Sequence, residues 1–140
     1  MSQENVEIVR RATEEFQAGV ERGDPGAFFD LESVADDYEW VLAPESFGEV
    51  PIYRGREGFL EFWRDFTEDF REWSMSLERL IDAGDDLVVS IVRQRATGKA
   101  SGVPVEWHMG QIQELKNGRV IRVTTYTSVE QTLKAAGLSE

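Results

Sequence analysis

The only histidine of the chain, His108, lies between Trp107 and Met109 in the segment VEWHMGQIQEL. Histidine is the side chain whose unperturbed form takes up and releases a proton near neutral pH. In a cavity, such a side chain could serve as the acid or base of a proton transfer that needs no cofactor. The alternative is a structural role, in which His108 bonds across strands to Thr125 or Glu106 or lies in a dimer interface.

Side-chain alternation along the expected strand 103–115 decides between these roles. His108 and Gly110 point to one face of this strand, and Trp107 and Met109 point to the other. If Gly110 faces a cavity, His108 faces it too. A slip of one residue, or a bulge at Gly110, turns His108 outwards and brings Trp107 and Met109 inside.

Four aromatic residues could form the walls of a site around such a group. Tyr38 and Trp40 share one face of an expected strand, so both would line one cavity in that register. Tyr53 flanks the loop expected to cover the cavity mouth, where it could hydrogen-bond a ligand. Trp63 belongs to the aromatic stripe of a helix that would form a lid or back wall. Packing in the hydrophobic core explains these residues equally well.

The composition restricts the partners and the chemistry. Fifteen Lys and Arg residues against 27 Asp and Glu leave a formal net charge of -12, which disfavours nucleic acids and anionic membrane surfaces. With no cysteine and one histidine, thiolate and multi-histidine metal sites are excluded, and we expect no metal and no cofactor. We predict neither a membrane span nor a secretory signal, and therefore a cytoplasmic protein.

The hydrophobic periodicity predicts helices first and strands afterwards. Helices are expected at residues 2–22, 25–34, 56–70 and 128–137, and strands at 38–43, 73–84, 85–98, 103–118 and 119–128. This order is the α+β pattern of one domain spanning residues 1–140. We expect a curved antiparallel sheet that wraps around the N-terminal helices and leaves a cone-shaped cavity, a common place for a ligand.

Three stretches carry a resemblance to a known family. RGDPGAFFDLESVADDYEW, YRGREGFLEFW and KNGRVIRVTTYTSVEQTLKAAGL occur in the order and spacing of the SnoaL-like branch of the nuclear transport factor 2-like superfamily, which the chain resembles over nearly its whole length. That superfamily includes polyketide cyclases, ketosteroid isomerase, limonene epoxide hydrolase, scytalone dehydratase and members that only bind or assemble. The resemblance therefore implies a fold rather than a chemistry.

The catalytic sets of these relatives are not reproduced in this sequence. The resemblance to ketosteroid isomerase aligns Phe16 with its tyrosine, Leu42 or a neighbour with its base, and Gly110 or Met109 with its acid, so all three groups are missing. Where limonene epoxide hydrolase has a catalytic aspartate, this sequence has a threonine. Scytalone dehydratase uses a pair of histidines, which a chain with one histidine cannot form. By this resemblance Phe16 and Gly110 would line the cavity, and His108 is the remaining catalytic candidate.

Two hypotheses follow. In the first, the protein binds a small apolar or aromatic molecule in a conical pocket and, if it is an enzyme, performs an isomerase, cyclase or hydrolase step with His108. In the second, it is a non-catalytic binding or assembly module. The resemblance also implies a homodimer through the sheet face, where Arg93 and Arg95 are expected to form cross-strand ion pairs with Glu106 or Glu114.

Overall fold

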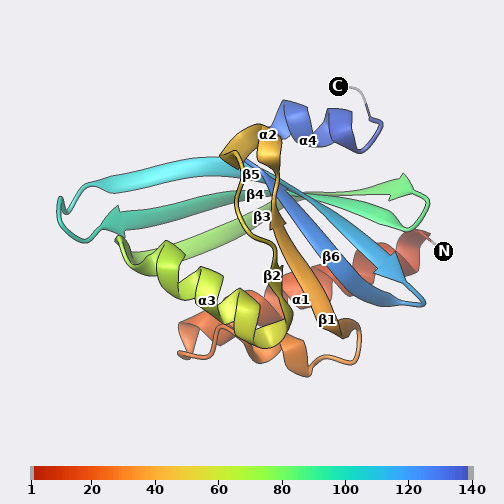
Figure 1. Cartoon of the computed structure of the whole chain (residues 1–140), viewed down its shortest axis with the longest axis horizontal. Coiled ribbons are helices and arrows are strands. Elements are labelled where there is room, and N and C mark those ends of the chain that lie inside the picture. Colours follow the sequence, from red (N-terminus) through yellow and green to blue (C-terminus); the bar gives the residue numbers. More distant parts are fainter. Residues whose placement is uncertain (1, 139–140) are drawn as a thin grey trace.

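The computed structural model describes residues 2–138, in which helices and strands follow the predicted order. The elements are α1 (Ser2–Glu21), η1 (Ala27–Asp30), β1 (Val34–Leu42), α2 (Pro44–Phe47), β2 (Tyr53–Arg54), α3 (Gly55–Thr67), β3 (Phe70–Gly84), β4 (Leu87–Gly98), β5 (Pro104–Lys116), β6 (Arg119–Tyr126) and α4 (Val129–Ala135). Figure 1 shows the curved sheet with α1 and α3 on one side and α4 on the other. The predicted α+β class is confirmed.

The six strands form one open sheet in the order β2-β1-β6-β5-β4-β3. Strands β3 to β6 are consecutive antiparallel neighbours, as the sequence predicts. Strand β1 differs, because it pairs with β6 in parallel. A parallel pair requires a long connection, and here the whole segment from α2 to β5 lies between the two strands.

Turn chemistry sets the connections inside this sheet. The Asn-Gly turn between β5 and β6 has positive φ at both residues, 53° at Asn117 and 76° at Gly118. The turn between β3 and β4 has positive φ at Asp85 and Asp86. Two successive positive φ angles match the right-handed twist of neighbouring strands, which explains why these short segments join long hairpins.

The two faces of the sheet pack against different helices. We call the face toward α1 and α3 the inner face, and the face toward α4 the outer face. Successive side chains of β4 point to opposite faces of the sheet. Val88 packs in the core beneath α1 and α3, and Val89 packs in the core beneath α4. This is the two-residue period of a strand buried on both sides.

The helices agree with the predictions except that the short helix α2 (Pro44–Phe47) forms where a loop was expected and that two other expected helices differ in extent. Ser128 caps α4 by accepting a hydrogen bond from the Gln131 backbone N–H at 3.1 Å, and Gly137 follows the helix with φ of 79°. The expected second helix is only a 3-10 turn, and α3 ends at Thr67 rather than at residue 70. Among residues 2–138, no helix combines the length and the apolar character of a membrane span.

An ion-pair cluster on the outer face joins β1 to both of its neighbours. The Glu39 carboxylate accepts hydrogen bonds from Arg122 Nε of β6 at 2.9 Å and from Arg54 Nε of β2 at 3.0 Å, and Arg122 Nη2 lies 2.8 Å from Glu39 Oε1 as an ion pair. The Glu39 side chain is mostly buried, at 19% exposed. Hydrogen bonding to Arg122, followed by that to Arg54, holds the pKa of the Glu39 carboxyl below its usual range.

We predict that Glu39→Gln destabilises the protein by about 1 kcal/mol at neutral pH. Because the folded-state pKa of Glu39 is lowered, its carboxylate contributes stability above the unfolded-state pKa, and this contribution is lost as the pH falls through the folded-state pKa. The free-energy difference between wild type and variant should therefore shrink on acidification. Urea unfolding at several pH values measures it, with Glu49→Gln in an exposed loop as control, and a difference independent of pH contradicts the prediction.

Candidate functional site

A pocket of about 120 Å³, partly open to solvent, lies between the inner face of the sheet and the helices α1 and α3. Apolar cavities of about 150 Å³ hold a benzene-sized molecule, so the space suits a single ring. Half of the lining residues are aromatic: Phe16, Phe28, Tyr38, Trp40, Phe47, Phe59, Phe62, Trp63, Phe66 and Trp73. The others are Ala12, Thr13, Val34, Leu42, Met75, Gln94, Met109, Gln111, Gln113 and Val120.

The aromatic wall is held together by contacts between its own rings. Phe16 of α1 meets the rings of Phe28, Phe59, Trp63 and Trp73 edge to face, with centroid distances between 5.1 and 5.6 Å. Such pairs contribute beyond the area that they bury. The pocket is therefore formed before any ligand enters, which lowers the entropic cost of binding.

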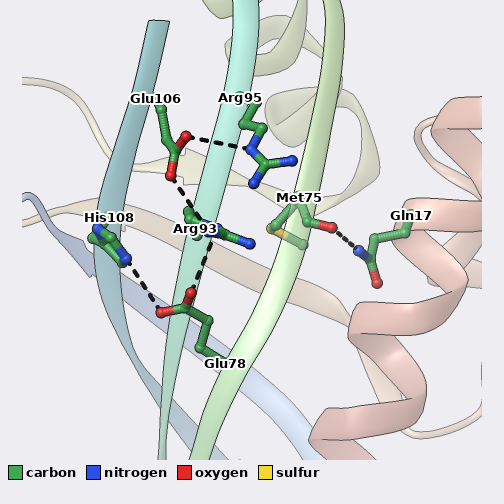
Figure 2. A network of polar contacts seen from close by, with 7 residues as sticks. All are labelled: Gln17, Met75, Glu78, Arg93, Arg95, Glu106 and His108. Atoms are coloured by element: carbon green, nitrogen blue, oxygen red, sulfur yellow. Dashed lines mark hydrogen bonds and ion pairs between the residues drawn. The ribbon is translucent and has the colours of Figure 1, made fainter.

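Helix α1 is fixed against the sheet beside this wall. The Gln17 side-chain amide donates a hydrogen bond to the backbone carbonyl of Met75 on β3, as Figure 2 shows. Met75 itself lines the pocket. The bond therefore sets the distance between α1 and the part of the pocket wall that β3 forms.

Uncharged polar side chains from β4 and β5 form one strip of the pocket wall. The Trp73 indole N–H donates to Gln94 Oε1 at 2.7 Å, and the Ser90 hydroxyl donates to Gln111 Oε1 at 3.1 Å. Gln113 Nε2 in turn donates to Ser90 Oγ at 3.3 Å. These glutamines were not predicted as site residues, although Gln111 and Gln113 share a strand face with Met109 and that alternation was the available signal.

The pocket wall carries almost no ionisable groups. Tyr38 is the only titratable side chain among the lining residues of the described chain, and burial raises the pKa of its phenol well above the usual range. Its hydroxyl therefore stays protonated at neutral pH. Within residues 2–138, no group of three or more His, Asp or Glu side chains could hold a metal ion. The wall can bury apolar surface and exchange hydrogen bonds, but it offers no base at neutral pH.

Four of the predicted ligand-contacting residues lie in the pocket wall, namely Phe16, Tyr38, Trp40 and Trp63. Tyr53 does not line the pocket. Its ring lies 5.5 Å from that of Phe62, which does line the pocket, so Tyr53 supports the wall from behind.

The prediction that Gly110 and His108 face the cavity is wrong. A Cβ atom on Gly110 would lie 2.6 Å from the Cβ of Thr132, so Gly110 faces α4 on the outer side of the sheet. Alternation then places His108 on the outer face as well, where its side chain is 50% exposed and its Nε2 lies 3.2 Å from Glu78 Oε1. Met109 and Gln111 take the inner positions. The geometric basis for an acid or base in the cavity is thereby removed.

The outer face carries the predicted cross-strand ion pairs. Arg93 lies 3.5 Å from both Glu78 and Glu106, and Arg95 lies 3.4 Å from Glu106, as Figure 2 shows. The partner on β5 is thus Glu106 rather than Glu114. Because these side chains are partly or largely exposed, each pair adds little to the stability of the fold.

A curved open sheet packed on helices, with an aromatic pocket between the two, places the chain in the α+β class of folds. A family model described as a SnoaL-like domain matches residues 13–123. The chain belongs to this family.

Solved structures of the nuclear transport factor 2-like type share the fold. One is a protein of unknown function from Burkholderia pseudomallei, with 17% identity, a TM-score of 0.68 and coverage of 94% of this chain and 95% of that one. Another, from Anabaena variabilis, has 19% identity, a TM-score of 0.70 and coverage of 91% of both chains. TerC, co-crystallised with polyporic acid, has 17% identity, a TM-score of 0.69 and coverage of 96% and 98%. No match was found among curated proteins.

The register of β5 can be tested with single-cysteine variants, because the sequence contains no cysteine. We predict that a charged thiol reagent modifies folded His108→Cys at least about tenfold faster than folded Met109→Cys, because position 108 is exposed on the outer face whereas position 109 faces an apolar pocket that disfavours a charged reagent. Both variants should react equally fast in urea, which controls for intrinsic reactivity. Equal or reversed rates in the folded proteins would mean that the register is wrong.

Proposed function

We propose that the protein binds a compact, uncharged ring compound in the inner pocket. The observation that carries this proposal is the composition of the pocket wall, in which the described residues contribute ten aromatic side chains and three glutamines but no charged side chain. An ion would lose its hydration in such a site without gaining a partner. The net charge of -12 further disfavours anionic ligands.

The size of the pocket sets the expected affinity. Small ligands gain about 0.3 to 1.5 kcal/mol per non-hydrogen atom, so a molecule of about nine such atoms gains at most about 3 to 13 kcal/mol, which corresponds to dissociation constants between about 10 mM and about 0.1 nM. TerC, a protein of similar fold, is co-crystallised with the organic molecule polyporic acid. This similarity supports a ligand in the pocket. Because the sequence identity is only 17%, the chemistry of that ligand is inferred from the residues of the pocket wall.

The composition of the pocket wall favours ligand binding over catalysis of a proton transfer. A cofactor-free isomerase or cyclase step needs a base near the reacting carbon, and the described lining residues offer only the Tyr38 phenol. His108 lies on the other face of the sheet, beside Glu78. We therefore propose a binding protein whose pocket holds its ligand without an acid or base from His108.

The homodimer and the cytoplasmic location stay predictions. Helix α4 covers part of the outer face, through a core that includes Ile112 and Leu133. The charged side chains shown in Figure 2 occupy the neighbouring part. A dimer through that part would be held by ion pairs rather than by apolar contact, and it would weaken in salt.

We predict that the wild-type protein binds toluene and phenol but not benzoate, and that Ala12→Leu weakens both interactions by at least about tenfold. Ala12 lines the pocket from α1, and a larger side chain there fills the space that the ring needs. Ala18→Leu, on an exposed position of the same helix, is the matched control and should leave affinity unchanged. Isothermal titration calorimetry measures these affinities. Preferred binding of benzoate, or equal affinities in both variants, would refute the proposal.

A further inference from the structure

Gln111 and Gln113 of β5 place two amide groups side by side in the pocket wall. They are two residues apart on one strand, so both side chains project from the inner face, and both line the pocket. Gln113 Nε2 donates to Gln111 Oε1 at 3.4 Å and to the Ser90 hydroxyl at 3.3 Å. The Ser90 hydroxyl donates to Gln111 Oε1. The three side chains therefore hold one another in place.

These bonds leave one NH2 group and one carbonyl oxygen unused. A primary amide offers two N–H donors and a carbonyl oxygen, and neither Gln111 Nε2 nor Gln113 Oε1 bonds to another described residue. Flipping both amides exchanges the two residues' roles but still leaves one NH2 group and one oxygen free.

The two unused groups have access to open space. Among the described residues, the buried side-chain polar atoms that have no hydrogen-bond partner are Trp40 Nε1, Arg93 Nε and Thr125 Oγ1. No atom of Gln111 or Gln113 is among them, so the free groups of the two glutamines are not fully buried. Since Gln113 is only 7% exposed and Gln111 is partly buried, the space that their free groups reach is the pocket.

We propose that Gln111 and Gln113 together recognise a hydrogen-bond acceptor next to a donor on an uncharged ring compound, as in a ring that bears a carboxamide. The ligand's carbonyl oxygen accepts from the free NH2 group, and its N–H donates to the free amide oxygen. The aromatic wall takes the ring. This specificity rests on the proposed function, since it requires that the pocket bind a ligand at all.

A polar strip of this kind changes which ligand the pocket prefers. A purely apolar pocket would strongly favour a hydrocarbon, because an amide loses its bonds to water on entry. Two fixed partners offset that loss, and a site built to hydrogen-bond its ligand rejects analogues that lack the matching groups.

Three probes of the same shape test the proposal. Benzamide carries an acceptor and a donor, acetophenone carries the acceptor alone, and α-methylstyrene carries neither. Their dissociation constants are measured by calorimetry on wild type, Gln111→Met and Gln113→Met. Gln131→Met is the matched control on α4, outside the pocket. Melting temperatures confirm that each variant folds.

We expect each pocket variant to weaken benzamide by about five- to tenfold and to leave α-methylstyrene within about twofold of wild type. Acetophenone should weaken in only one of the two variants, because it lacks the donor. The Gln131→Met control should change none of the three affinities. If benzamide is unaffected in both variants, or α-methylstyrene weakens equally, the recognition by the two glutamines is refuted.

Wild type alone provides a second criterion that needs no variant. Benzamide should bind within about tenfold of α-methylstyrene or more tightly, and a larger preference for the hydrocarbon overturns the inference while the proposed function stands. If none of the three probes binds, the proposed function itself fails. The two failures are thus distinguishable in one set of titrations.

Discussion

The close approach of α4 to β5 at Gly110 determines which side chains meet the pocket. A Cβ atom at this position would lie 2.6 Å from the Cβ of Thr132, so only glycine lets the helix rest on the outer face here. Once Gly110 faces outward, the two-residue period of the strand directs Met109 and Gln111 inward. A slip of one residue would turn Met109 and Gln111 outward and bring His108 into the cavity.

This register separates the charges of the protein from its pocket. Although the formal net charge is -12, the pocket is lined by rings and amides, and the ion pairs of Glu39 and Arg93 lie on the outer face. Burial of an unpaired charge costs far more than burial of a bonded amide, which makes the separation favourable. The result is a preformed apolar site with a few fixed hydrogen-bonding groups, suited to a neutral ligand.

Local signals predicted most of the fold, and long-range contacts decided the rest. The helix from residue 128 and the division between the strands at residues 118 and 119 depend on local features, a cap at Ser128 and an Asn-Gly turn, so the sequence alone was enough to predict them. The parallel pairing of β1 with β6 joins distant segments and has no local signature. The face of the sheet to which Gly110 points depends on its contact with α4, which comes later in the sequence. Glycine has no side chain whose polarity could indicate that face. For that reason the glutamines of β5 were missed.

Side-chain NMR during titration with toluene tests the central claim most directly, that the inner pocket and not the outer face binds a neutral ring. Met75 and Met109 line the pocket, and the single histidine lies on the opposite face, so each face has its own reporter. We predict that ring currents shift both methionine methyl signals while the imidazole signals of His108 stay unchanged. Shifts at His108 with unmoved methionine signals would contradict this account.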